Sequence, residues 1–169
     1  DAFDIPLLSL CDTPGFLVGP QAEATGLVRH TSRMFVTVAS LSVPVFTIVL
    51  RKGYGLGAMA MAAGGFHSTA FTVAWPTGEF GGMGLEGGVR LGFRKELDAL
   101  DDPVQREALY DELVAAAYQR GKALSTAVSL EIDAVIDPLE SRRWIISGLN
   151  AMPAPTPREG RKRPFVDTW

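Results

Sequence analysis

One stretch of the sequence constrains the fold most: an apolar, β-branched run that passes through a glycine-rich turn into a run of small residues. Residues 43–50 (VPVFTIVL) have the composition of a buried strand. Glycines follow at Gly53, Gly55 and Gly57, and residues 58–63 (AMAMAA) have high helix propensity. This order predicts a helix that begins where a buried strand ends, which is the basic unit of an α/β domain.

The glycine-rich turn has a functional and a structural interpretation. The first N–H groups of a helix have no intrahelical partner and lie at the positive end of the helix dipole, so they can bind a phosphate or a reaction oxyanion. Glycine lets a ligand approach that backbone closely. In the structural interpretation, the glycines only close the turn and let the helix pack on the sheet. The stretch by itself is compatible with both.

Composition narrows the class of protein. The chain has 169 residues, of which 47% are hydrophobic, and a net charge of −3, which predicts one globular domain and no basic surface for nucleic acid. The single cysteine, Cys11, excludes an internal disulfide, and its apolar surroundings predict a buried structural thiol. No signal peptide is visible and no apolar run is suited to spanning a bilayer, so we expect no membrane association and a cytoplasmic location.

The other elements follow from periodicity and from helix-cap signals. In chain order we expect a strand at 5–11, a helix at 20–39, a strand at 70–75, a helix at 85–93, a helix from 103 capped by Asp102, a short strand at 134–136 and a last helix from 138. Strand–helix alternation followed by helices predicts an α/β domain with ligands at strand ends. The domain is placed at 1–150, and a Pro-rich basic tail, expected to be mobile, at 151–169.

Familiar catalytic motifs are weak in this chain. Residues 53–58 (GYGLGA) fit a loose dinucleotide fingerprint, but the next strand ends in Ala-Trp-Pro, without the acidic residue that would bind a ribose. His30 and His67 are far apart, no metal-ligand spacing occurs, and a hydrolase G-x-S-x-G motif is absent. The sequence therefore offers oriented backbone amides, which suit a reaction whose enolate-like oxyanion is stabilised while the reactant supplies its own base.

Several segments, taken in order, resemble the carboxyltransferase (β) subunit of biotin-dependent acyl-CoA carboxylases of the acetyl- or propionyl-CoA type. They are residues 5–7 (IPL) with 11–16 (CDTPGF), 26–30 (GLVRH), 43–44 (VP) with 51–55 (RKGYG), 75–77 (WPT) with 83–87 (MGLEG), and 136–138 (IDP) with 142–143 (RR). The resemblance extends from about residue 3 to residue 149, and it is to the C-terminal half of that subunit. It implies an α/β fold of the crotonase-like (ClpP/crotonase) type, a ββα superhelix.

The resemblance also implies a reaction of fatty acid and propionyl-CoA metabolism. Carboxybiotin releases CO2 in the site, the biotin ureido group takes the α-proton of a short acyl-CoA, and the enolate attacks CO2. The biotin-side oxyanion hole maps onto four consecutive residues: Gly55, Leu56, Gly57 and Ala58. The residues expected to line the substrate cleft are Pro14, Gly15, Phe16, Tyr54 and Met59. Met59 stands where some members of the family have a polar or acidic residue that influences acyl-chain choice, and no metal is implied.

The resemblance implies several partners. They are acyl-CoA, a biotin carboxyl carrier with its biotin carboxylase component, an N-terminal carboxyltransferase half and further copies in a homo-oligomer. The chain begins at Asp1 without methionine, so we expect that the N-terminal half is missing, that the sheet exposes apolar surface, and that these residues alone are inactive and self-associate. Two alternatives stay open: a biotin-dependent decarboxylase of a malonyl-type CoA thioester, and a non-catalytic assembly subunit.

Overall fold

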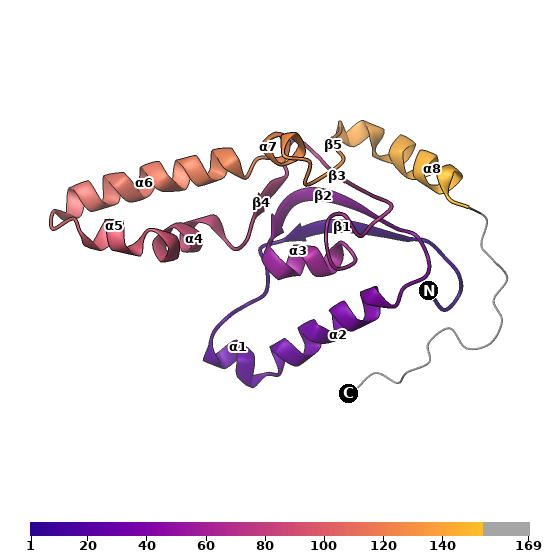
Figure 1. The fold of residues 1–169 in the computed structure, drawn as a ribbon, viewed down its shortest axis with the longest axis horizontal. Helices are drawn as coiled ribbons and strands as arrows, with labels where there is room; N and C mark the ends of the chain where they lie inside the picture. The colour runs from indigo at the N-terminus through magenta and orange to yellow at the C-terminus, as the bar shows by residue number, and fades with distance from the viewer. Residues whose placement is uncertain (154–169) are drawn as a thin grey trace.

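The computed structural model describes residues 1–153 and places a parallel sheet at the centre of the molecule (Figure 1). Four strands follow the order β1-β2-β3-β5, and β4 pairs with the far end of β2. The bounds are Leu7–Thr13 for β1, Val45–Tyr54 for β2, Phe71–Ala74 for β3, Glu79–Gly81 for β4 and Ala134–Val135 for β5. These four pairings are all parallel, as expected for strands joined by helical connections.

Strand β2 is longer than the sequence predicted. The expected end at residue 50 was wrong, because the strand continues through Gly53 and stops at Tyr54. Its first half, residues 45–49, is buried between β1 and β3, whereas its second half pairs with β4 in the register Lys52↔Glu79. The second partner strand, which the sequence analysis missed, therefore keeps the backbone extended up to the first residue of the helix.

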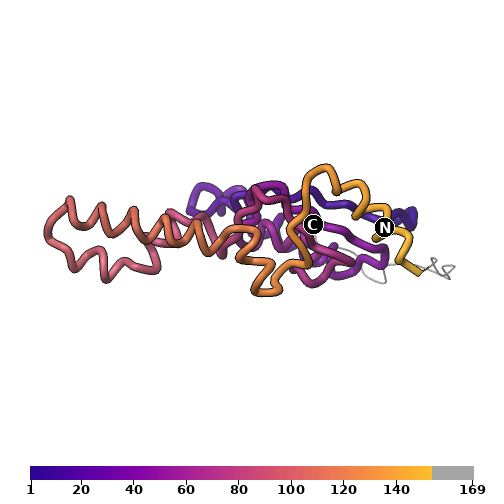
Figure 2. The backbone as a smooth tube through the Cα atoms, turned by 90° about the horizontal axis from the view of Figure 1, so that it is seen from above, coloured from indigo at the N-terminus to yellow at the C-terminus, as the bar shows by residue number. Residues whose placement is uncertain are grey.

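Eight α-helices surround the sheet within residues 1–153. Their bounds are Pro20–Ala24 (α1), Leu27–Ala39 (α2), Gly55–Met61 (α3), Leu85–Gly92 (α4), Arg94–Asp98 (α5), Pro103–Arg120 (α6), Ala123–Val128 (α7) and Ser141–Ala151 (α8), and a 3-10 turn covers Pro138–Glu140. Helices α4, α5 and α6 form an arm that extends away from the sheet (Figures 1 and 2). No helix among these is both long and apolar enough to cross a membrane.

The single helix expected at 20–39 was wrong, because the chain breaks it at Gly26. Gly26 has a φ of 76°, a left-handed conformation that glycine adopts without a Cβ clash. Helix α1 ends just before it, where the Thr25 hydroxyl donates to the carbonyl of Ala22 at 2.6 Å. The predicted caps of two later helical segments are confirmed: Asp102 accepts from the N–H of Val104, and Asp137 from that of Leu139.

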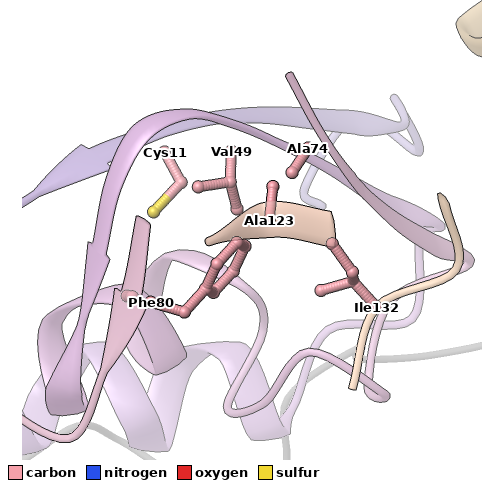
Figure 3. Close-up of a cluster of buried hydrophobic side chains, with 7 residues drawn as sticks. Cys11, Val49, Ala74, Phe80, Ala123 and Ile132 are labelled. Carbon is pink, nitrogen blue, oxygen red and sulfur yellow. The ribbon is translucent and has the colours of Figure 1, made fainter. Parts of the chain in front are cut away.

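Two apolar clusters pack on opposite faces of the sheet, since side chains alternate along each strand. On the face of α3 and α7 the buried members are Cys11, Val49, Ala58, Ala74, Phe80, Ala123 and Ile132 (Figure 3). On the face of α8 they are Phe46, Ile48, Phe71, Val73 and Ile136. Cys11 has no exposed surface, as predicted, and this burial raises the pKa of its thiol to about 11. Residues 154–169, most of the predicted tail, lie outside the described residues.

Candidate active site

The first turn of α3 lies at the end of the central strand. Tyr54 is both the last residue of β2 and the N-cap of α3, with extended backbone angles. As in any α-helix, the first N–H groups, here those of Gly55, Leu56 and Gly57, have no intrahelical acceptor, and no side chain caps this helix. We call residues 55–57 the donor turn. It can donate hydrogen bonds to an anionic oxygen without help from a charged side chain.

The loop after β1 packs directly against the donor turn. A Cβ atom added at Gly57 would lie 3.0 Å from the Cα of Gly15 and 3.2 Å from the hydroxyl oxygen of Thr13. Gly15 itself has a φ of +99°, and its N–H donates to the Thr13 hydroxyl at 3.2 Å. A Cβ there would lie 3.3 Å from the carbonyl oxygen of Tyr54. Glycine at both positions therefore allows a backbone-to-backbone approach that larger residues would prevent.

Strand β4 holds the opposite side of the turn. Gly55 has a φ of +57°, and a Cβ added there would lie only 2.7 Å from the carbonyl oxygen of Gly82, just after β4. The Tyr54 hydroxyl donates to Oε2 of Glu79 at 2.9 Å. Glu79 was not among the predicted site residues, although only Gly78 separates it from the Trp-Pro-Thr segment. The donor turn is thus packed between the loop after β1 and the strand β4.

A cavity of about 730 Å³ opens beside the donor turn. Two of the predicted site residues, Gly55 and Met59, line it, and the side chains of Phe66 and Phe80 meet in its wall edge to face, with ring centroids 5.3 Å apart. Its other lining residues are Gly53, Gly65, His67, Ser68, Gly81, Gly82, Leu85, Ala117, Arg120, Gly121, Thr126, Ser129 and Glu131. The volume and the largely apolar wall are typical of a site for a small organic group.

Two phenols, that of Tyr54 beside the donor turn and that of Tyr118 on α6, are held in their protonated form. Burial, followed by the hydrogen bond to Glu79, raises the pKa of Tyr54. Tyr118 donates to Oε1 of Glu86 at 2.6 Å, which raises the pKa of Tyr118 to about 12 and lowers that of Glu86. At neutral pH neither phenol is a proton acceptor, so neither suits base catalysis.

A polar contact fastens the end of β1 to β2 near the same loop. Asp12 accepts from the backbone N–H of Lys52 at 3.0 Å and forms an ion pair with Arg51 at 3.1 Å. These two partners, the backbone N–H first, hold the pKa of the Asp12 carboxyl below its usual range. The loop that contacts Gly57 therefore begins from a fixed strand end.

The structure brings most of the predicted site residues together. Gly15, Tyr54 and Gly57 are in contact, and Pro14 and Phe16 flank Gly15 in the same loop. Leu56 is 58% exposed, whereas Ala58 is fully buried in the apolar cluster below the helix. His67 lines the cavity, but His30 lies on α2, exposed, beside Arg33. Ala58 thus contributes its side chain to packing rather than to the surface of the site.

Comparisons with known proteins identify relatives of this chain. The chain is 40% identical over 149 residues to the methylmalonyl-CoA carboxyltransferase 12S subunit of Propionibacterium freudenreichii subsp. shermanii, covering 88% of this chain and 28% of that protein. It is 36% identical to the propionyl-CoA carboxylase carboxyltransferase subunit of Haloferax mediterranei, covering 90% of this chain and 29% of that protein. The chain therefore spans under a third of the length of these curated relatives.

Solved structures show the same fold. A single-chain, multi-domain long-chain acyl-CoA carboxylase is 60% identical with a TM-score of 0.74, over 86% of this chain and 14% of that one. The hexameric transcarboxylase 12S, with methylmalonyl-CoA and methylmalonic acid bound, is 35% identical with a TM-score of 0.75, over 94% of this chain and 31% of that one. These likenesses to crotonase-fold carboxyltransferases confirm the predicted crotonase-like α/β fold. The carboxyl transferase domain family matches residues 1–163, and the chain belongs to that family.

Proposed function

We propose that this chain is part of a biotin-dependent acyl-CoA carboxyltransferase, which moves CO2 from carboxybiotin to the α carbon of an acyl-CoA. The observation that carries the proposal is the uncapped donor turn, packed between the loop at Gly15 and strand β4 beside the cavity. Membership of the carboxyl transferase family and relatives that act on acyl-CoA thioesters support it. The expected cytoplasmic location belongs to the same proposal.

The donor set of the turn fits the ureido oxygen of biotin. When bound, biotin would supply the carboxyl group and then the base for the α-proton, and its ureido oxygen would carry negative charge once CO2 had left. We assign the N–H groups of Leu56 and Gly57 as the donors to such an oxygen, with Gly55 and Ala58 on either side; the uncapped start of α3 supports this assignment. Donors held in a fixed direction stabilise the developing charge more strongly than mobile water does, because no reorganisation is needed.

In the proposed reaction, side chains contribute less than the backbone N–H groups. Met59 lines the cavity and is 38% exposed, which places an unbranched apolar group beside the donor turn. We assign it, with Tyr54 and the loop Pro14, Gly15 and Phe16, to the walls of the substrate cleft. Neither His30 nor His67 is needed as a base, since the biotin group accepts the proton.

We propose both a class of acyl substrate and its expected members. The class is an acyl-CoA, and the expected members are acetyl- or propionyl-CoA. A long-chain acyl-CoA carboxylase at 60% identity makes longer chains the direct competitors. Assaying the complete enzyme with acetyl-, propionyl- and a long-chain acyl-CoA at equal concentration distinguishes them, because kcat/KM ranks substrates by transition-state binding.

The remaining partners are proposed for the whole protein. A second half of the carboxyltransferase supplies the oxyanion hole for acyl-CoA, and a biotin carboxyl carrier delivers the carboxyl group. Copies of the protein assemble, as the hexameric relative does. Strand β1, which pairs with β2 alone among the described residues and exposes Leu7, Leu8 and Leu10, offers a surface for such assembly.

The test is carboxyl transfer by the complete protein. Purified enzyme is given its carboxylated biotin carrier and, in separate assays, acetyl-, propionyl- or a long-chain acyl-CoA, and the carboxylated acyl-CoA formed is measured. The proposal predicts product that depends on both substrates, and its absence with a folded enzyme and an active carrier contradicts it.

A second candidate, decarboxylation of a malonyl-type CoA, is supported by a relative at 34% identity, the methylmalonyl-CoA decarboxylase alpha subunit of Propionigenium modestum. Release of CO2 from methylmalonyl-CoA that exceeds transfer would favour it.

A further inference from the structure

The residue before the donor turn is tied to strand β4 by a side-chain hydrogen bond. Tyr54 precedes Gly55 directly, and its hydroxyl donates to Oε2 of Glu79 at 2.9 Å. The two residues are 25 positions apart in sequence but lie on neighbouring strands, two positions out of register, since Lys52 pairs with Glu79 and Tyr54 with Gly81. The contact therefore crosses from β4 to the junction between β2 and α3.

Glu79 is itself held in place on both sides by the backbone. The N–H of Phe80 donates to the carbonyl of Gly121 at 2.7 Å, and the N–H of Ala123 donates to the carbonyl of Gly78 at 2.8 Å. Glu79 also forms a β-bridge with Lys122 in the same α6–α7 junction. The carboxylate of Glu79 is thus attached to a strand that is fixed between β2 and the end of the helical arm.

The packing around the turn limits its movement in some directions only. The backbone of Gly15 stops Gly57 from moving toward the loop, and the carbonyl of Gly82 stops Gly55 from moving toward β4. Contacts of this kind prevent approach, but they do not prevent the turn from moving away. The backbone ladder between β2 and β4 ends at the pair Tyr54↔Gly81, and the hydrogen bond from Tyr54 to Glu79 adds a side-chain attraction at this end of the ladder.

We propose that Glu79 is a positioning residue: through the hydroxyl of Tyr54, it fixes the donor turn in the orientation in which its N–H groups meet the reacting oxygen. This inference rests on the proposed carboxyltransferase function and adds a residue to it. Glu79 does not contact the substrate in this account, and it transfers no proton. A carboxylate acceptor makes a stronger hydrogen bond than a neutral one, which suits a contact that must hold geometry.

The kinetic test uses the complete enzyme and four variants. Tyr54→Phe and Glu79→Ala remove the hydrogen bond, Glu79→Gln keeps an oxygen acceptor, and the double variant Tyr54→Phe/Glu79→Ala completes the cycle. We expect each of the first two to lower kcat about tenfold, because losing a hydrogen bond to a charged group has an effect of this size. KM for acyl-CoA should stay within about twofold, and Glu79→Gln should recover most of kcat. The double variant should be no worse than either single one.

A control variant separates this contact from phenol–carboxylate contacts in general. Tyr118→Phe removes the hydrogen bond to Glu86, which joins α6 to α4 on the arm and does not reach the donor turn. We expect its kcat to stay within about twofold of the wild-type enzyme, the range of an exposed hydrogen bond. A loss in Tyr118→Phe as large as in Tyr54→Phe would overturn the assignment of a specific positioning role to Glu79.

A second readout does not depend on activity. Hydrogen exchange followed by mass spectrometry should show faster exchange in the peptide that covers residues 54–61 for Tyr54→Phe and Glu79→Ala, but not for Glu79→Gln or Tyr118→Phe. Unchanged exchange there in both bond-deleting variants, or additive losses of kcat in the double variant, overturns the inference. If the wild-type enzyme transfers no carboxyl group, the proposed function fails, and the exchange rates still decide whether Glu79 holds the turn.

Discussion

Gly57 and Gly15 meet backbone to backbone: a Cβ atom on Gly57 would lie 3.0 Å from the Cα of Gly15. The contact joins the first turn of α3 to the loop that follows β1, which are 42 positions apart in the sequence (57 minus 15). A Cβ on Gly57 would press on the backbone of Gly15, and one on Gly15 would press on the carbonyl of Tyr54. The position of the donor turn therefore depends on glycine at both residues, and this dependence can be tested by substitution.

Replacing Gly57 by valine should abolish most of the activity. The added side chain meets the loop at Gly15 and displaces the turn, so donors to the oxyanion are lost or misdirected. Removing one such donor lowers turnover about 100- to 1,000-fold in other enzymes. Carboxyl transfer by the complete enzyme is the measurement.

Gly87→Val is the matched control for that substitution. Gly87 lies inside α4, and a Cβ added there has nothing within 4 Å. Turnover in this variant should stay within about threefold, because valine replaces glycine in open space on a helix. Near-normal turnover in a folded Gly57→Val enzyme would remove the donor turn from the mechanism.

The two histidines should be dispensable for chemistry. His67 lines the cavity and His30 is exposed on α2, but in the proposed reaction the α-proton goes to the biotin group. We expect His30→Gln and His67→Gln each to keep turnover within about tenfold, since loss of a true general base lowers it about 100- to 10,000-fold. A larger loss in a variant with unchanged fold and assembly would indicate a side-chain base.

Because its thiol is buried, Cys11 should make the free energy of unfolding fall as the pH becomes alkaline. Burial first, and the nearby Asp12 second, raise the pKa of Cys11 to about 11 in the folded state. A group whose folded pKa lies above its unfolded value stabilises the fold below the unfolded pKa, near 8.5, and this stabilisation is lost as pH rises through about 11.

Chemical denaturation between pH 8 and 11 measures that effect. The unfolding midpoint of the wild-type protein should fall over this range more than that of Cys11→Ala, which lacks the thiol. Equal pH dependence in the two proteins would show that Cys11 is not the group responsible. In the folded protein at pH 7.5, iodoacetamide should leave Cys11 unmodified, since it has no exposed surface.

A preparation of these 169 residues alone should self-associate and should not carboxylate acyl-CoA. Among the described residues β1 is an edge strand, and its Leu7, Leu8 and Leu10 are 39%, 42% and 52% exposed. An edge of this kind pairs readily with another chain. Light scattering tests the association: a clean monomer would contradict the argument from exposed surface. Full activity of the preparation would contradict the proposal that a second half supplies the acyl-CoA site.

Local signals in the sequence predicted the central elements well. The β-branched run, the glycines and the small-residue run gave the strand and helix that meet at Tyr54, and Asp102 and Asp137 gave two caps correctly. The break at Gly26 was missed because a glycine inside an apolar periodic pattern often stays helical, whereas here Gly26 adopts a left-handed conformation.

The features that the sequence did not predict depend on pairing between residues that are far apart in the chain. Strand β4 has three residues between glycines, so its local pattern is that of a loop, and only its pairing with β2 makes it a strand. For the same reason Glu79 could not be placed beside Tyr54 from spacing. The family resemblance implied only that the loop at Pro14, Gly15 and Phe16 lines the same cleft as the donor turn, and the contact between Gly15 and Gly57 came from the structure, because nothing in composition or periodicity joins those two positions.

The most direct measurement is a structure of the complete enzyme with its biotin group bound in the carboxyltransferase site. The account predicts that the ureido oxygen lies about 2.7–3.1 Å from the backbone nitrogens of Leu56 and Gly57, the range expected of oxyanion donors. If that oxygen lies elsewhere, held by a side chain and out of reach of both backbone nitrogens, the donor turn is not the biotin-side oxyanion hole.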